Sequence, residues 1–223
     1  LDMSRIESGK FSLKCEPVNL PELISSVLLL IKPDLTKRNH TMHVKSSVLD
    51  YDIVMGDGLH IQKILMNLMS NAVKYTPDGG EISISLEERK RADGMIDIIF
   101  RVEDNGIGME PDFVKRIFRP FERAEDNRLS KIVGTGLGMA ITKNIVDIMG
   151  GTICVESEPG VGSKFTVVLP MALSESHSQD VGFLDGHAVL VVDDSQDTCE
   201  GIRIMLEEVG AVSYTHLTLP TKA

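Results

Sequence analysis

The sequence predicts an α/β protein in which helices lie over one face of a mixed sheet, and three observations carry this prediction. Residues 81–102 and 152–169 each contain two runs of alternating apolar and polar residues around a turn, as β-hairpins do. Runs with helical periodicity precede each hairpin. Beyond residue 186, one apolar strand followed by one helical run is typical of the start of a doubly wound sheet. We therefore expect a two-layer α/β sandwich over residues 11–170, followed by a truncated doubly wound unit.

The first half of the sandwich is expected to hold two strands and two helices. In chain order these are a strand at 11–16, a helix at 21–37, a strand at 41–48 and a helix at 57–73. Asp57 is suited to cap the second helix, because its side chain can accept a free N–H group of the first turn. The Thr-Pro-Asp-Gly-Gly run at 76–80 is a cluster of helix breakers and ends that helix.

The second half is expected to contain the two hairpins with helices between them. The elements are strands at 81–86 and 95–102, a short helix near 111–117, a helix at 136–149, and strands at 152–157 and 163–169. Pro170 closes the unit. The polar stretch 122–131 has no clear periodicity and is expected to be a loop.

The composition excludes several classes of protein. With 223 residues the chain has room for one sizeable core, or for one domain and a fragment of another. A content of 42% hydrophobic and 25% charged residues is that of a soluble globular protein. The 23 basic and 33 acidic residues give a net charge of −10, which disfavours a general attraction to nucleic acid. A bound phosphate group would therefore need a local basic site.

The cysteines and the apolar runs indicate the compartment. Cys15, Cys154 and Cys199 are far apart and form no C-x-x-C pair, so neither a zinc site nor a disulfide framework is suggested. The longest apolar run is 27–31, far shorter than the ~20 residues that span a bilayer. We expect a cytoplasmic chain. Because it begins at Leu1 within a helix-like run, we expect a piece of a longer protein, whose anchoring in the inner membrane is left open.

Three polar residues share one stripe of the helix predicted at 57–73 and just beyond it. Asn67, Asn71 and Lys74 are spaced i, i+4 and i+7, beside an apolar stripe. Amide oxygens are hard ligands suited to Mg²⁺, and an ammonium group suits phosphate, so a magnesium-triphosphate site is chemically sensible. Taken alone, the stripe is as readily a solvated helix face.

Residues 104–108, Asp-Asn-Gly-Ile-Gly, follow an apolar strand. Asn105-Gly106 is a common turn signal, and by itself the turn is the favoured interpretation. The functional alternative is that the Asp104 carboxylate accepts a hydrogen bond from an exocyclic amine such as that of adenine. Glycines at 106 and 108 would let the backbone lie close to a flat ring.

A second glycine-rich run, Gly-Thr-Gly-Leu-Gly at 134–138, opens a predicted helix. Backbone N–H groups at a helix N-terminus favour an anion there. The spacing matches neither G-x-G-x-x-G, since Met139 stands where the third glycine would fall, nor the P-loop pattern. The alternative is a glycine-rich hinge.

Phe118-Arg-Pro-Phe121 precedes this run and is suited to anchor the intervening loop. That loop carries several basic residues, namely Arg119, Arg123, Arg128 and Lys131. Anchored in this way, it would form a basic lid over a triphosphate and supply the local positive charge that the net −10 requires. The alternative is that the aromatic pair only packs.

Asp193 and Asp194 follow the apolar run at 189–192. Paired carboxylates at the carboxyl end of a buried strand suit Mg²⁺ in a doubly wound sheet. A helix cap for the following segment is equally favoured.

The order and spacing of four motifs resemble the N, first glycine, F and second glycine boxes of sensor histidine kinases. They are NLMSNAVKYTP at 67–77, DNGIG at 104–108, FRPF at 118–121 and GTGLGMAI at 134–141. Residues 150–170 also match the way that catalytic domain ends. The resemblance implies the Bergerat-type ATP-binding fold, with ATP and Mg²⁺ as ligands.

The resemblance also implies roles for individual residues. Asp104 would hold the adenine amino group, and Tyr75 would line the nucleotide site. Asn71, with Asn67 nearby, would bind Mg²⁺, and Lys74 would bind the phosphates; these three form the catalytic set. The full set expected to contact ATP is Asn67, Asn71, Lys74, Tyr75, Asp104, Gly106, Gly108, Phe118, Phe121, Arg123, Lys131, Gly134, Thr135, Gly136, Leu137 and Gly138.

Domain boundaries follow from the same resemblance. Residues 187–194, HAVLVVDD, look like the start of a receiver domain, which implies a hybrid kinase. The expected segments are the end of a dimerisation and histidine-phosphotransfer helix at 1–9, the catalytic ATP-binding domain at 10–172, a linker at 173–186, a truncated receiver at 187–212 and a non-native tail at 213–223.

Two parts of such a kinase are missing from the sequence. None of the 6 histidines is followed by an acidic residue, as the phosphoacceptor is in the family, so that histidine is expected upstream of Leu1. The receiver stops before its phosphoacceptor aspartate, so Asp193 and Asp194 are expected to form half of a magnesium site. The implied partners are the histidine-phosphotransfer domain of the same protein, a receiver domain or response regulator, and a second copy in a full-length homodimer.

The preferred function is transfer of the γ-phosphoryl group of ATP to a histidine of the missing domain. An ATPase of the gyrase, heat-shock chaperone or mismatch-repair type is the alternative. Those enzymes place a glutamate general base where this chain has Asn67, which cannot take a proton from water. A third possibility is a chain without catalysis, either a nucleotide-gated interaction module or a fragment that binds nothing. The intact set of motifs argues against lost binding.

Overall fold

The computed structural model describes residues 12–46, 49–122, 136–174, 188–191 and 212–215. The chain forms two compact units, Leu1–Glu175 and Ser176–Ala223.

A seven-stranded mixed sheet forms one layer of the first unit. Its strands are β1 (Glu16–Asn19), β2 (Thr41–Ser46), β3 (Ile53–Gly56), β4 (Glu81–Lys90), β5 (Ile96–Asp104), β6 (Thr152–Glu158) and β7 (Gly162–Leu173). The order across the sheet is β1-β3-β7-β5-β4-β2, and β6 also pairs with β7. β2 and β4 are parallel, and the other pairs are antiparallel. The mixed sheet predicted from the sequence is therefore confirmed.

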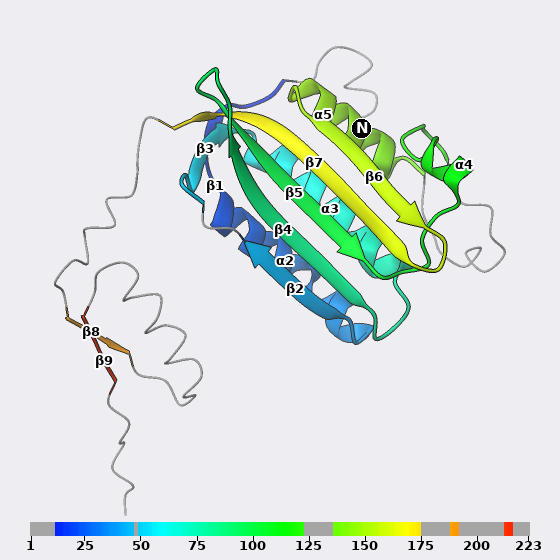
Figure 1. Ribbon diagram of the computed structural model, residues 1–223, viewed down its shortest axis with the longest axis horizontal. Helices are drawn as coiled ribbons and strands as arrows, with labels where there is room; N and C mark the ends of the chain where they lie inside the picture. Colours follow the sequence, from blue (N-terminus) through cyan, green and yellow to red (C-terminus); the bar gives the residue numbers. More distant parts are fainter. Residues whose placement is uncertain (1–11, 47–48, 123–135, 175–187, 192–211, 216–223) are drawn as a thin grey trace, which may run out of the picture. The chain divides into compact units, whose positions relative to one another are not determined.

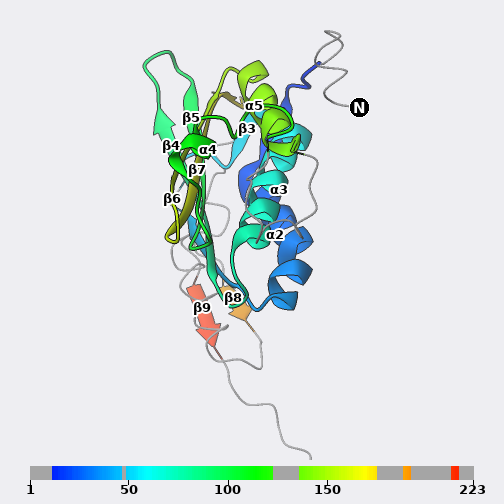
Figure 2. The same ribbon diagram turned by 90° about the vertical axis from the view of Figure 1, so that its right-hand side faces the viewer.

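Three helices cover one face of this sheet (Figure 1). They are α2 (Leu20–Lys37), α3 (Gly58–Tyr75) and α5 (Gly138–Ile148), and a single turn, α4 (Pro111–Val114), lies near β6. Seen from the side, the helices form one layer and the strands the other (Figure 2). The two-layer sandwich is thus as predicted.

The core lies between the two layers. The inward residues of β4 and β5 alternate with outward ones, as the period of two requires. The sheet contributes Ile82, Ile84, Leu86, Ile98, Phe100 and Val102, and α3 contributes Ile61, Ile64, Leu65, Leu68 and Met69, all of them buried. One face of α3 is therefore held firmly against the sheet, and its polar stripe lies at the border of the core.

Local signals explain where the two long helices begin. The Asn19 side chain accepts a hydrogen bond from the Glu22 N–H at 2.9 Å and caps α2. The Asp57 carboxylate accepts one from the His60 N–H at 3.0 Å and caps α3, as predicted. Asp57 also accepts the backbone N–H of Lys14 at 2.8 Å, which ties the chain before β1 to the start of α3.

The strand limits differ from those predicted at both ends of the sheet. The first strand is Glu16–Asn19 rather than 11–16, and β3 was not predicted at all. β7 continues through Pro170 to Leu173. Along one edge, β7 pairs with β6 up to Val168 and with β3 from Ala172 onward. Pro170 lies between these two paired segments. A residue without a backbone N–H is tolerated at such a gap.

The second unit contains two described strands, β8 (Ala188–Val191) and β9 (Val212–Thr215), which pair in parallel. β8 is the strand predicted after residue 187. The helical run predicted after that strand lies outside the described residues. β9 begins at the last residue of the predicted receiver, and its other three residues belong to the predicted non-native tail.

None of the helices in the described part of the chain is long and apolar enough to cross a membrane.

Candidate functional site

Asp104 stands at the end of β5 and belongs to the inward-facing set of that strand. Its side chain is 8% exposed, and its carboxylate accepts the Gly106 backbone N–H at 2.9 Å. Burial raises the pKa of this carboxyl to about 6, although hydrogen bonds from the backbone of Gly106 and Ser163 oppose the rise. A buried carboxylate that water solvates poorly gains more from a new hydrogen-bond donor than an exposed one does.

The loop after Asp104 is bound to the end of α3. The Ile107 N–H donates to the Tyr75 carbonyl at 3.2 Å. A Cβ atom on Gly106 would lie 2.6 Å from Asp104 Oδ1 and 2.7 Å from the Tyr75 carbonyl oxygen. Only glycine fits between these two groups. The turn predicted at Asn105-Gly106 therefore exists, and it also brings Asp104 next to the last residue of α3.

The turn between β6 and β7 supports the same loop from the other side. The Gly160 N–H donates to the Ile107 carbonyl at 2.8 Å. Gly108 has a φ of +65°, and a Cβ there would collide with the carbonyl oxygen of Glu158. The loop at 104–108 is thus held between α3 and the β6–β7 turn, which keeps the Asp104 carboxylate in place.

Asn67 and Asn71 face the beginning of α5. The Asn67 amide donates to the Thr142 hydroxyl at 2.7 Å, and the amide nitrogens of Asn67 and Asn71 lie 3.5 and 3.2 Å from the Met139 sulfur. A Cβ on Gly138 would lie 2.5 Å from Asn67 Oδ1. Gly138 therefore permits the close approach of α5 to α3, a role that its position in a glycine-rich run did not reveal.

The last turn of α3 carries the remaining members of the polar stripe. Lys74 Nζ lies 5.0 Å from the centre of the Tyr75 ring, within the range of a cation–π contact. Both residues are half-buried. The predicted set of Asn67, Asn71 and Lys74 is thus on one face of one helix, with the Asp104 loop bound at the end of that helix.

Phe118 and Phe121 behave differently from each other. Phe118 packs against the core, as expected of an anchor, whereas Phe121 is 73% exposed. Phe121 has a φ of +65°, and its N–H donates to the Gly136 carbonyl at 3.0 Å. Gly136 also has a positive φ, of +69°, and a Cβ there would lie 2.9 Å from the Phe121 backbone. These contacts join the F box to the second glycine box, directly before Leu137 and α5.

Several predicted site residues lie outside the described part of the chain, so their placement stays a prediction. They are Arg123, Lys131, Gly134 and Thr135 of the expected lid, and Asp193 and Asp194 of the expected receiver.

Thr76 belongs to the motif at 67–77 and to the helix breakers at 76–80, but the sequence analysis gave it no role in the site. It is fully buried, and its hydroxyl has no hydrogen-bond partner among the described residues. A buried hydroxyl without a partner is costly, so a molecule that brings a hydrogen-bonding group to this place would be stabilised. The signal available beforehand was its position directly after Tyr75.

The same residues fit a nucleotide with its magnesium ion. Asp104 offers an acceptor for an amine, Gly106 and Gly138 remove side chains from crowded positions, and Asn71 offers an amide oxygen. Within the described ranges, no group of three or more His, Cys, Asp or Glu side chains could hold a metal ion. Mg²⁺ usually takes substrate phosphate oxygens and water beside one or two protein ligands, so it does not require such a cluster.

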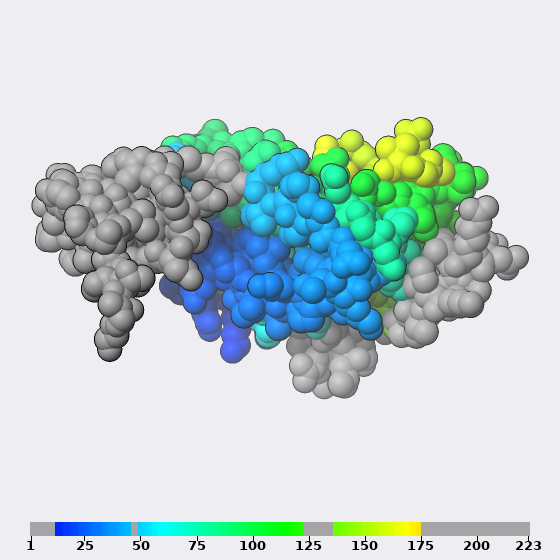
Figure 3. Space-filling model, turned by 90° about the horizontal axis from the view of Figure 1, so that it is seen from below, coloured from blue at the N-terminus to red at the C-terminus, as the bar shows by residue number. Residues whose placement is uncertain are grey.

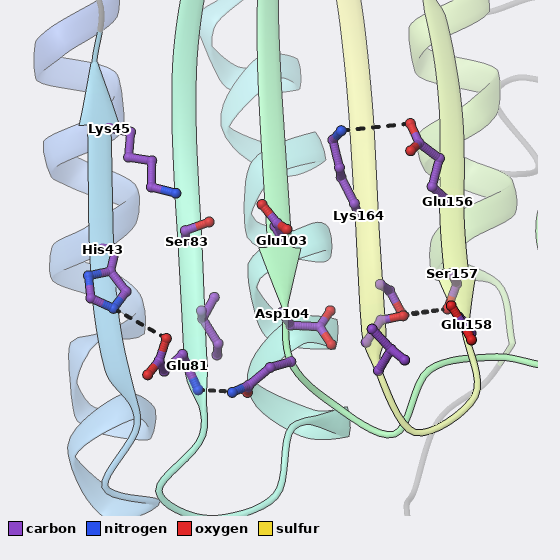
Figure 4. Close-up of a pocket in the computed structure, with 15 residues that line it drawn as sticks. His43, Lys45, Glu81, Ser83, Glu103, Asp104, Glu156, Ser157, Glu158 and Lys164 are labelled. Atoms are coloured by element: carbon purple, nitrogen blue, oxygen red, sulfur yellow. Dashed lines mark hydrogen bonds and ion pairs between the residues drawn. The ribbon is translucent and has the colours of Figure 1, made fainter.

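A hollow also lies on the face of the sheet that the helices leave open (Figure 4). It measures about 640 Å³, and charged residues on neighbouring strands form ion pairs beside it, His43 with Glu81 at 3.7 Å and Lys164 with Glu156 at 3.8 Å. Glu103 points to this face, whereas the Asp104 side chain belongs to the buried set that alternates with it along β5. Asp104 and Asn105 nevertheless line one end of the hollow, where β5 ends. Among the described residues, the other three motifs contribute none to its lining.

Comparison with known proteins agrees with the fold and the motifs. Residues 56–173 match the family model described as histidine kinase-, DNA gyrase B- and HSP90-like ATPase. The solved catalytic domain of the histidine kinase ThkA is 28% identical, with a TM-score of 0.61, over 71% of this chain and 97% of that one. Full-length ShkA, solved in complex with AMPPNP, has a TM-score of 0.69 at 24% identity over 98% of this chain and 44% of that one, which supports the fold.

Curated relatives of this chain are sensor kinases. The sensor histidine kinase GacS of Pseudomonas protegens is 31% identical over 216 residues, 94% of this chain and 23% of GacS. The sensory/regulatory protein RpfC of Xanthomonas campestris is 36% identical over 78% of this chain and 24% of RpfC. The autoinducer 2 sensor kinase/phosphatase LuxQ of Vibrio cholerae is 33% identical over 78% of this chain and 20% of LuxQ.

This chain spans only about a quarter of the length of those relatives. Its first unit nevertheless has the fold, the four motifs in order and the family match over residues 56–173. The chain therefore belongs to the histidine kinase-, DNA gyrase B- and HSP90-like ATPase family, as the ATP-binding catalytic domain of a histidine kinase.

Proposed function

We propose that this domain binds Mg-ATP through the residues of the four motifs and transfers the γ-phosphoryl group to a histidine of a phosphotransfer domain. The observation that supports this proposal best is the buried Asp104 carboxylate, which the Gly106 N–H and the end of α3 hold in place. Its pKa of about 6 leaves it mostly ionised at neutral pH, as an acceptor needs to be.

Adenine recognition is assigned to Asp104. The exocyclic amine of adenine donates a hydrogen bond to the carboxylate, and a bond to a charged acceptor of this kind contributes roughly 1.5–3 kcal/mol. Gly106 and Gly108 leave the backbone of the loop bare for the flat ring. Tyr75 and the unpartnered hydroxyl of Thr76 lie at the adjoining end of α3.

The triphosphate is assigned to the polar stripe of α3 and the start of α5. Asn71, with Asn67 beside it, would hold Mg²⁺ by amide oxygens, and Lys74 would contact the phosphates. When bound, Mg²⁺ neutralises negative charge on the β- and γ-phosphates. Gly136, Leu137 and Gly138 precede or begin an 11-residue helix, whose first N–H groups favour an anion. Arg123, Lys131, Gly134 and Thr135 complete the proposed lid.

Phosphoryl transfer is favoured over hydrolysis because of Asn67. An ATPase of this family needs a general base at that position, and an amide cannot accept a proton from water. Here the Asn67 amide also bonds Thr142. The bond between the γ-phosphorus and the β,γ-bridging oxygen of ATP would break, and that oxygen would leave with ADP. At the same time a bond would form between the γ-phosphorus and a histidine nitrogen of the partner domain. The residues of this chain act by positioning and by neutralising charge.

Further partners follow from the relatives. The similarity to GacS covers 94% of this chain, more than the first unit alone supplies. This coverage supports a receiver domain that begins near residue 187, in which Asp193 and Asp194 would supply half of a magnesium site. We further propose that the full-length protein is a cytoplasmic homodimeric kinase, or one anchored in the inner membrane, that passes the phosphoryl group to a receiver.

Binding is tested by calorimetry on the whole chain with Mg-ATP. The wild type should bind, and Asp104→Asn should bind at least about tenfold more weakly, because it loses the charged acceptor. Glu103→Gln is the matched control, since it removes the neighbouring carboxylate on the open face of β5 and should bind as the wild type does. Equal binding by Asp104→Asn would refute the assignment.

Transfer is tested by mixing the chain with a separate histidine-phosphotransfer domain and γ-labelled ATP. An acid-labile, base-stable label on that domain supports the kinase. Release of free phosphate without any labelled partner supports the ATPase alternative, and binding without either product supports a nucleotide-gated module.

A further inference from the structure

We propose that Arg38 is a positioning residue for the triphosphate, acting through the last turn of α3. This inference rests on the proposed binding of Mg-ATP by that helix. Arg38 lies just after α2, far from the four motifs in sequence, and its side chain reaches the end of α3. Figure 3 shows the face of the molecule formed largely by α2 and the segment that follows it.

The side chain of Arg38 has three protein partners. Its Nη1 donates to the carbonyl oxygens of Val73 and Lys74, the latter at 3.0 Å, and its Nε donates to Asp78 Oδ1 at 2.8 Å. The backbone carbonyl of Arg38 accepts the Gly79 N–H at 2.9 Å. The guanidinium group is thus fixed to both the helix end and the turn that follows it.

These bonds complete the last turn of α3. The final carbonyl groups of a helix have no partner within it. Here Arg38 donates hydrogen bonds to the carbonyl oxygens of Val73 and Lys74, and the Val73 oxygen also lies 3.2 Å from His40 Nε2. The Tyr75 carbonyl accepts the Ile107 N–H. The turn between α2 and β2 therefore holds the Val73 and Lys74 carbonyls in place, and the loop that carries Asp104 holds the Tyr75 carbonyl. Arg38 fixes how the Lys74 backbone is oriented relative to the adenine-binding loop.

Charge gives Arg38 a second effect. The C-terminal end of a helix is negative, which opposes a triphosphate that approaches Lys74 there. A guanidinium bound to the terminal carbonyls offsets that negative end, and its ion pair with Asp78 at 2.8 Å reduces the size of this effect.

The test compares ATP with adenosine on variants of the whole chain. Arg38→Gln and Arg38→Ala should weaken Mg-ATP binding by about tenfold, because the geometry and charge around Lys74 both change, and should change adenosine binding by less than about twofold. Arg38→Lys, which keeps the charge, should recover part of the loss. Lys37→Gln is the matched control, because it removes the neighbouring exposed charge of α2, and should bind as the wild type does.

A double variant shows whether the effect passes through Lys74. If it does, adding Arg38→Gln to Lys74→Ala should weaken ATP binding by much less than Arg38→Gln does alone. Unchanged ATP binding in folded Arg38→Gln and Arg38→Ala would overturn this inference and leave the proposed function standing. So would an equal loss of ATP and adenosine, which indicates a general structural role. A wild type that binds no Mg-ATP would overturn the proposed function, and this inference with it.

Discussion

The side-chain amide of Asn67 donates a 2.7 Å hydrogen bond to the hydroxyl of Thr142, which is 2% exposed. This bond joins α3 to α5 at the point where Gly138 lets the two helices approach closely. The first asparagine of the motif therefore has a structural partner as well as a proposed place near the metal ion.

Replacing Thr142 with valine should lower the free energy of unfolding by about 1–2 kcal/mol, because the half-buried Asn67 amide loses its partner while the volume is kept. Urea denaturation checks this value. Thr152→Val, at an exposed position of β6, is the control and should change the stability by less than about 0.5 kcal/mol. Equal stability of both variants would show that the Asn67–Thr142 bond contributes nothing net.

Asp104→Asn should make the protein more stable at neutral pH while it weakens ATP binding. The pKa of Asp104 lies above its ordinary value of 3.8, at about 6, so the folded state favours the protonated form and the ionised form destabilises it. The difference corresponds to at most about 3 kcal/mol. The amide introduced by this substitution would keep an oxygen for the Gly106 N–H without the buried charge.

The difference in stability between the wild type and Asp104→Asn should depend on pH in one direction. As the pH rises from about 4 to above about 6, the wild type should lose stability relative to Asp104→Asn, and the gap should then level off. Urea denaturation of both proteins across this range measures the gap. The affinity of the wild type for ATP should change in the opposite direction and fall as the pH drops below about 6. A constant gap would mean that Asp104 does not titrate in this range.

Gly106→Ala should disturb the site from within the loop. Its Cβ would lie 2.6 Å from Asp104 Oδ1 and 2.7 Å from the Tyr75 carbonyl oxygen, so the loop must move away from α3. We expect a loss of about 1–3 kcal/mol of stability and at least a tenfold loss of ATP affinity. Gly56→Ala, where the nearest atom would be 3.6 Å away, should be tolerated. Tolerance of both substitutions would show that the loop yields easily.

Asp57→Ala should destabilise α3 and release the chain before β1. Burial tends to raise the pKa of Asp57, but hydrogen bonds from Lys14 and His60 outweigh it, so the pKa lies below its ordinary value. The ionised carboxylate is therefore stabilising above pH ~4, and that contribution is lost as the pH falls through the lowered pKa. Loss of the cap should cost about 1–2 kcal/mol at pH 7. Thermal melts at pH 7 and near pH 3 should show the difference between variant and wild type shrinking at the lower pH.

The elements predicted well from the sequence are those with their own local signals. α3 has a cap at Asp57 and breakers at 76–80, and the two hairpins alternate around clear turns. β3 was missed because its four residues are too few to show a period, and only pairing with β1 and β7 makes them a strand. The continuation of β7 past Pro170 also depends on its neighbours, because a proline normally ends a strand prediction.

Sequence alone determined the family, the order of the motifs and the residue types of the candidate site, because short-range spacing along α3 and around the glycines records them. Tertiary structure decided which of these residues contact one another. It placed the Asp104 side chain in the buried set of β5, packed Gly138 against Asn67 and bound the Tyr75 carbonyl to Ile107. It also brought Arg38 to the end of α3, 35 residues from Val73 along the chain. No local pattern marks such contacts, because they arise only when the helices and the sheet pack together.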